Sequence, residues 1–186
     1  MPAAGLRIDS SYCFAFAGGQ CRFTAEEPFN GSRRYGDVLE VALSGFRLPR
    51  CPWDAPAKPV DIMGVGFPEC REAIGKITSA GADAVMILHS FSLMKVRDKQ
   101  YTSARRNRIV ERRFRHLCRW LAGWHGCCAP VAPCDAPVPV CTFDQLGKAL
   151  AAGQYQAREA APCAGSSPLR ALVRKGVQLY NRCYWT

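Results

Sequence analysis

The stretch from Ala84 to Met94, "AVMILHSFSLM", decides the fold, because an apolar run ends there on a histidine and then turns polar. Ala84–Leu88 predicts a strand that is buried on both faces, which is typical of a parallel sheet. In such sheets the functional side chains lie where the strands end, and His89 occupies that position. An imidazole titrates near neutral pH, so His89 is a candidate for acid–base chemistry. A core histidine that is satisfied by the backbone fits the same pattern.

A helix precedes this strand. Pro68 is favoured in a first helical turn, and Ala73, Ile74 and Ile77 form an apolar stripe behind it. Gly81 is placed to end the helix. A helix, a glycine turn, an apolar strand and a polar residue in succession predict one αβ unit.

Asp9 is the second candidate site residue. It ends a short strand, Leu6–Ile8, and is followed by two serines. An aspartate hydrogen-bonded to an imidazole fixes its tautomer and stabilises its charged form. An Asp-Ser-Ser run also caps helices and turns, so this alternative stays open. Because no helix or strand precedes the short strand, we expect the chain to start inside a domain.

The segments between these two candidates are less regular. Residues 14–37 contain several glycines and predict a loop. Val38–Leu43 alternates, with Glu40 on the face opposite the aliphatic residues, and predicts a strand. Four prolines between residues 48 and 59 exclude a helix or a central strand.

The second half of the chain predicts three helices. The first runs from about residue 103 to 124, with apolar residues at helical spacing and seven arginines around them. The second begins at Thr142 as N-cap, with Gln145 three residues later as its capping partner. Residues 160–168 read as a linker, and residues 169–185 as a basic amphipathic helix.

Composition places the chain among ordinary globular proteins, with 186 residues, 48% hydrophobic and 22% charged. The net charge of +10, from 25 Lys+Arg against 15 Asp+Glu, favours contact with acidic polymers. The N-terminus lacks the features of a signal peptide, so we expect a cytoplasmic chain whose eleven cysteines are reduced. No segment approaches the roughly 18 apolar residues of a membrane span.

Two further kinds of site have a signal in the sequence, a metal site and a nucleic-acid surface. Cysteines and histidines gather between residues 116 and 141, but without a Cys-x-x-Cys or His-x₃₋₅-His pair, so no metal or other cofactor is expected in this chain. The arginine-rich helix offers charge for nucleic acid. Its aromatic residues fall within the apolar stripe rather than on an exposed stacking surface, so a solvated basic face is expected instead of nucleic-acid binding.

Four segments, taken in order, resemble the C-terminal half of the polysaccharide deacetylases, the NodB-homology domain of carbohydrate esterase family four. They are "GLRIDSSY", "YGDVLEVALSGFRLP", "AGADAVMILHSFSLM" and "RRFRHLCRWLAG…VCTFDQL", and together they span about residues 4 to 150. The resemblance implies an α/β fold: a partial irregular (β/α) barrel that lacks its first strands, with long proline-rich loops and a C-terminal basic helix. Residues 1–150 would be the barrel portion, and residues 151–186 a linker and amphipathic helix.

The resemblance also implies a chemistry. Such deacetylases remove acetyl groups from N-acetylated sugars with a divalent metal, such as zinc, held by one aspartate and two histidines. "ILHS" resembles their late Leu-x-His motif, so His89 would be the general acid that protonates the leaving amine. Asp9 would correspond to the aspartate that pairs with it.

The chain departs from the family in its early motifs. Neither Thr-Phe-Asp-Asp, nor the His-x-x-x-His metal pair, nor Arg-x-Pro-x-Tyr is present. We therefore expect a truncated or degenerate deacetylase-like protein, inactive as this chain and dependent on a missing N-terminal segment for a carbohydrate substrate. The alternative is a non-catalytic basic module that binds an anionic polymer, either a nucleic acid or an acidic polysaccharide. Which polysaccharide an intact relative would use, and the oligomeric state, are left open.

Overall fold

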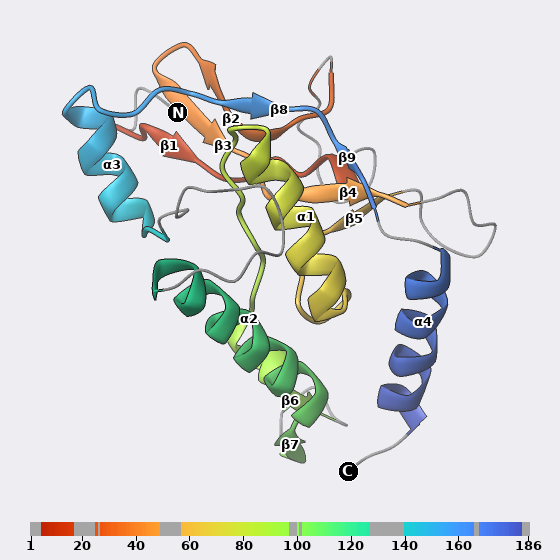
Figure 1. Cartoon of the computed structure of the whole chain (residues 1–186). Helices are drawn as coiled ribbons and strands as arrows, with labels where there is room; N and C mark the ends of the chain where they lie inside the picture. Colours follow the sequence, from red (N-terminus) through yellow and green to blue (C-terminus); the bar gives the residue numbers. More distant parts are fainter. Residues whose placement is uncertain are drawn as a thin grey trace.

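The computed structural model describes residues 5–16, 25, 27–48, 57–96, 100, 102–126, 140–165 and 168–183. This part of the chain is mixed α/β, with two small sheets in the upper half of Figure 1 and two long helices below them. The described strands do not close into a barrel. The α/β class is thus confirmed, and the partial barrel stays a prediction.

The first sheet has the order β1-β3-β2-β8. Its strands are β1 (Ile8–Asp9), β2 (Asn30–Tyr35), β3 (Val38–Val41) and β8 (Glu159–Ala160). β1 runs parallel to β3, and the other pairs are antiparallel. β3 is buried along its whole length because it has a strand on each side and packed side chains on both faces. The predicted loop over residues 14–37 is therefore wrong where β2 forms.

The second sheet has the order β5-β4-β9, and a separate hairpin lies apart from it. The sheet contains β4 (Gly45–Arg47), β5 (Ala57–Pro59) and β9 (Cys163–Ala164), and the hairpin contains β6 (Met94–Val96) and β7 (Ala104–Arg106). Proline is tolerated in β5 because β5 is an edge strand. Residues 151–165 therefore supply an edge strand to each sheet, where a linker was expected.

The segment Ala84–Leu88 is extended but is not the doubly buried strand that its sequence predicts. It is half-buried and makes a single parallel bridge, between Asp61 and Ile87. Its backbone is divided between two partners, since Ser44 N–H donates to the Val85 carbonyl at 2.9 Å and Ile87 N–H donates to the Val60 carbonyl at 3.1 Å. No continuous ladder forms, so the segment is an extended connection that bonds to the residues before β4 and after β5.

Four helices follow from local signals in the sequence. They are α1 (Phe67–Ser79), α2 (Arg108–Gly126), α3 (Phe143–Ala151) and α4 (Pro168–Cys183). Pro68 lies in the first turn of α1 and Thr142 accepts from Gln145 N–H at the start of α3, as predicted. α2 begins five residues later than expected, because Ala104–Arg106 pair as β7.

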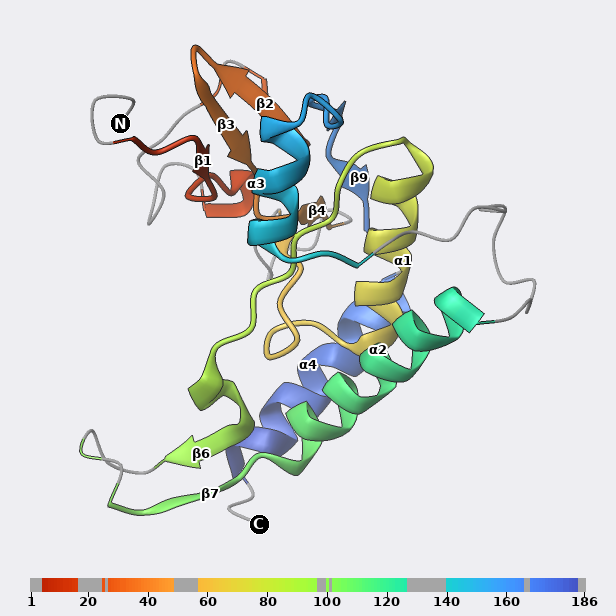
Figure 2. The same ribbon diagram turned by 90° about the vertical axis from the view of Figure 1, so that its left-hand side faces the viewer.

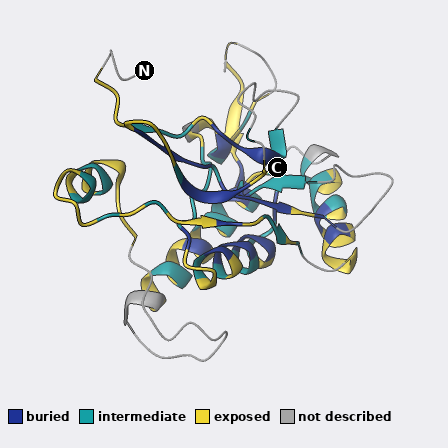
Figure 3. Ribbon diagram, turned by 90° about the horizontal axis from the view of Figure 1, so that it is seen from above, coloured by how far each residue is buried: buried dark blue, intermediate teal, exposed yellow. Residues whose placement is uncertain are grey.

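The main core lies between α1, α2 and the second sheet. Its buried members include Phe46, Val60, Ile74, Val110 and Leu117. Seen from above in Figure 3, the buried residues gather in the central strands and on the inward sides of the helices. In the described residues no helix is both long and apolar enough to cross a membrane.

Candidate functional site

Asp9 lies beside a second carboxyl group, that of Glu40. The parallel register of β1 and β3 places these two residues opposite each other. Glu40 is buried, and Tyr12 N–H donates to its Oε1 at 2.9 Å. The Asp9 carboxylate accepts from Ser10 N–H and from Ser11 Oγ, each at 2.9 Å. The observed hydrogen bonds of Asp9 are therefore those of a cap, which was the alternative to a catalytic role.

Burial raises the pKa of Glu40, because the charged form loses water. The hydrogen bond from Tyr12 N–H opposes this rise, while the charge and the hydrogen bond of Asp9 add to it. Glu40 thus holds its proton more readily than an exposed glutamate.

His89 lies elsewhere in the molecule. Its side chain is exposed and stacks on Phe91, with ring centroids 4.8 Å apart and planes 8° from parallel. Its backbone N–H donates to Ser92 Oγ at 3.2 Å, at the start of the 3₁₀ helix η3 (Ser90–Leu93) that leads into β6. In Figures 1 and 2, β6 lies at the bottom of the molecule and β1 at the top.

The structure therefore does not bring His89 and Asp9 together. No hydrogen bond or ion pair joins them, and the Asp9 side chain contacts Ser10, Ser11 and Glu40 instead. The parallel strand that was to carry His89 to the same edge as Asp9 does not form beyond one bridge. A catalytic role for either residue by itself stays a prediction. In this structure the two residues do not form a pair.

The described part of the chain contains no set of side chains that could bind the metal implied by the resemblance. There, no three His, Cys, Asp or Glu side chains are grouped so that they could hold an ion. Cys127, Cys128 and Cys134 lie outside the described residues, and Cys118 and Cys141 are free, exposed thiols. The described residues therefore do not fit the divalent metal that the resemblance implies.

A row of arginines on α2 is the most prominent charged feature. Arg108, Arg112, Arg115 and Arg119 are spaced by four, three and four residues, so they lie on one face of the helix. We call these four residues the basic stripe. The opposite face, with Val110 and Leu117, is buried in the core.

Arg113 is not part of the basic stripe. Its guanidinium donates to the carbonyls of Ile62 and Met63 at 3.2 and 3.0 Å. Burial lowers its pKa, because the charged form is taken from water. Arg113 therefore attaches α2 to the loop before α1.

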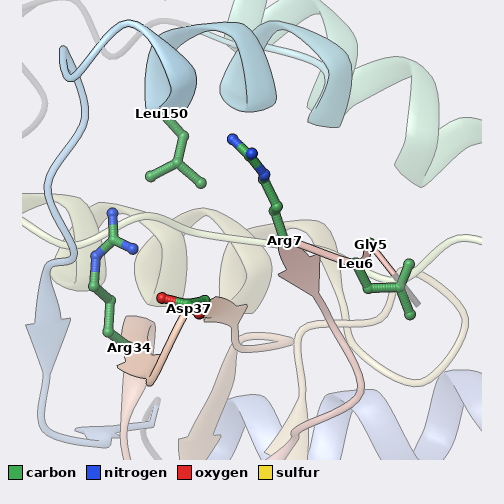
Figure 4. Close-up of a pocket in the computed structure, with 6 residues that line it drawn as sticks. All are labelled: Gly5, Leu6, Arg7, Arg34, Asp37 and Leu150. Atoms are coloured by element: carbon green, nitrogen blue, oxygen red, sulfur yellow. The ribbon is translucent and has the colours of Figure 1, made fainter. Parts of the chain in front are cut away.

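A second charged feature is a polar hollow of 420 Å³ at the end of the first sheet (Figure 4). Arg7 and Arg34 project into it beside Asp37, and Leu150 of α3 covers it. Sequence reasoning missed this hollow, because its residues come from three elements that no spacing rule connects. Its two cations face one carboxylate, which leaves it weakly positive.

Comparison with protein-family models, with curated proteins and with solved structures gave no match to this chain. The resemblance to the polysaccharide deacetylases therefore stays a prediction from the quoted motifs.

Proposed function

We propose that the chain is a non-catalytic module that binds an anionic polymer along the basic stripe of α2. The observation that carries this proposal is the exposure of all four stripe arginines on one helical face. Arg108 and Arg119 are 11 residues apart, which corresponds to about 16 Å along the helix axis. The stripe thus matches several successive charges of an extended polyanion.

The stripe is also largely unneutralised. Among the described residues Arg115 pairs with Glu111 at 2.8 Å, whereas Arg108, Arg112 and Arg119 make no ion pair. Guanidinium groups bind phosphate, sulfate and carboxylate in a forked geometry. When these groups bind a polyanion, they displace its counterions. The affinity therefore falls as the salt concentration rises.

Two aromatic residues of α2 do not take part in such a surface. Phe114 and Trp120 are partly buried against the core, so their rings offer no exposed face for base stacking. The proposed binding depends on charge, so an acidic polysaccharide and duplex DNA are both suitable probes.

The test removes three stripe charges and compares the result with three charges removed elsewhere. The stripe variant is Arg108→Gln/Arg112→Gln/Arg119→Gln. The control is Arg34→Gln/Arg47→Gln/Arg158→Gln, which takes the same charge from exposed residues outside α2. Affinity for heparin and for duplex DNA is measured over a salt series.

We expect the stripe variant to lower the slope of log K against log[salt] on duplex DNA by about 0.9 for each lost contact. The control should stay close to the unmodified chain. Equal weakening of both variants would show that net charge alone attracts the polymer, and salt-independent binding would contradict the proposal. Comparing heparin with DNA identifies the preferred polymer.

As a second candidate, we propose that the chain is a degenerate polysaccharide deacetylase-like protein that does not hydrolyse N-acetyl groups by itself. This is supported by the position of Asp9 at the carboxyl end of the parallel strand β1. Incubation with N-acetylated chitooligosaccharides and zinc should release no acetate above a protein-free blank. Acetate release that is lost in His89→Ala or Asp9→Asn would contradict the inactivity.

A further inference from the structure

A groove with a volume of 800 Å³ lies between α2 and α4, at the N-terminal end of α1. We call it the α2–α4 groove. Its apolar walls include Phe67, Ile109, Leu169, Val173, Val177 and Tyr180. Figures 1 and 2 both place α2 and α4 at the same end of the molecule, away from β1. The volume is within the range of small-molecule sites, about 300 to 1,000 Å³.

The α4 wall is unusual, because a charged residue of this helix is buried while several of its large apolar side chains are exposed. Its Arg174 is buried in an ion pair with Glu69, and Arg170 pairs with Glu72. Beside these arginines, along the same groove, Leu169 and Val173 remain 70% and 60% exposed. An amphipathic helix normally buries its apolar face, so this face offers surface to an apolar ligand.

The charged residues of the groove are mostly cationic. Glu69 is the one acidic residue among its described lining, and its carboxylate is already held by Arg174. Arg112 lines the groove without an ion pair among the described residues. His116 lies on the same wall and stacks on Phe67, with centroids 5.6 Å apart. An anionic group at this wall would meet cations and no free carboxylate.

We propose that the α2–α4 groove binds an anionic amphiphile through one long acyl chain. The acidic head lies against Arg112 and His116, and the chain lies along Leu169, Val173 and Tyr180. The shared chemistry, a carboxylate or phosphate on an acyl chain, comes either from a free fatty acid or from a membrane lipid. The α2–α4 groove and the basic stripe share Arg112 and no other residue.

The experiment uses the full chain and oleate below its micelle concentration, measured by displacement of a fluorescent fatty acid. Val173→Glu places a charge in the groove at an exposed position, where folding is not at risk. Leu172→Glu is the matched control, because Leu172 is 55% exposed on the same helix but does not line the groove. We expect Val173→Glu to weaken oleate binding about tenfold or more and Leu172→Glu to leave it unchanged.

Two further measurements test the head group and the source. Arg112→Gln should weaken oleate but not oleyl alcohol, which has the same chain without the charge. Arg108→Gln/Arg119→Gln should leave oleate binding unchanged while it weakens heparin binding, so failure of one proposal is distinguishable from failure of the other. Vesicles of phosphatidylcholine and phosphatidylglycerol in equal parts test the membrane source.

If a membrane lipid is the ligand of the groove, the chain should bind the vesicles. Val173→Glu should abolish this binding, Leu172→Glu should retain it, and oleate should displace it. Vesicle binding that both variants weaken equally would show that the outer face of α4 attaches to membranes, and would overturn the groove. The proposal is also overturned if oleate does not bind saturably, or binds Val173→Glu as well as the unmodified chain.

Discussion

Glu40 carries its carboxyl group inside the first sheet, so its protonation is coupled to folding. Its pKa is raised above the ordinary 4.5, chiefly by burial and further by Asp9. The folded state therefore binds more protons than the unfolded state between these two pKa values. The free energy of unfolding should fall as pH rises from about 4.5 through the folded pKa. Glu40→Gln cannot ionise, so its stability relative to the unmodified chain should increase as pH rises from about 4.5 until the folded-state carboxyl group has ionised.

Urea unfolding followed by circular dichroism at several pH values checks this expectation. Asp9→Asn is the control, because removal of the neighbouring charge lowers the pKa of Glu40 and should make the fall with pH shallower. A constant difference between Glu40→Gln and the unmodified chain at all pH values would show that Glu40 ionises alike in both states.

Cys70 illustrates a thiol made inert by its position. It is fully buried on α1, and burial raises its pKa to about 12. The reactive thiolate is therefore scarce at neutral pH. Iodoacetamide should alkylate the exposed Cys118 and Cys141 first and leave Cys70 unmodified until the chain unfolds. Peptide mass spectrometry after timed labelling measures the order, and early labelling of Cys70 would show that α1 opens readily.

At the scale of elements, β2 depends on one glycine. Gly31 has φ +85°, and a Cβ atom there would lie 2.1 Å from the Arg158 carbonyl oxygen and 2.8 Å from Ala82 Cβ. Gly36 has φ +59° with open space around it. Gly31→Ala should lower the free energy of unfolding by more than about 3 kcal/mol, whereas Gly36→Ala should cost about 1 kcal/mol from backbone conformation alone. If urea unfolding shows the same loss of stability for both variants, the segment at β8 must move away from β2 at little cost.

The attachment of α4 depends on the ion pair of Glu69 and Arg174, which are 3% and 1% exposed. Removal of one partner leaves a buried charge, so Arg174→Met should cost about 3 to 5 kcal/mol. Glu69→Leu/Arg174→Met should recover most of this loss, because no charge remains buried. Arg170→Gln, which breaks a more exposed pair with Glu72, should cost less than about 1 kcal/mol. A double variant as unstable as the single one would show that packing rather than charge holds α4.

For the whole molecule, sequence reasoning found the helices and missed most strand pairing. Pro68 and Thr142 mark helix starts through contacts within one turn, so local patterns are enough. The glycine at position 31 looked like a turn residue, but β2 forms because its partners lie far along the chain. Asp9 was a predicted site residue, whereas its neighbour Glu40 was not, because their contact depends on the register of β1 with β3.

The same dependence on long-range contacts makes local stability uneven across the molecule. Both strands of the β6–β7 hairpin are largely exposed, and among the strands that the structure describes their ladder bonds join only each other. β3 is buried throughout and has a strand on each side. Since local opening follows burial and shared hydrogen bonds, the amides of Met94–Val96 should exchange with deuterium much sooner than those of Val38–Val41. Exchange followed by mass spectrometry tests this order, with α1 as an internal reference for slow exchange. If the hairpin were protected as long as β3, the end of the molecule that carries His89 would be covered by a partner, because its own contacts do not supply that protection.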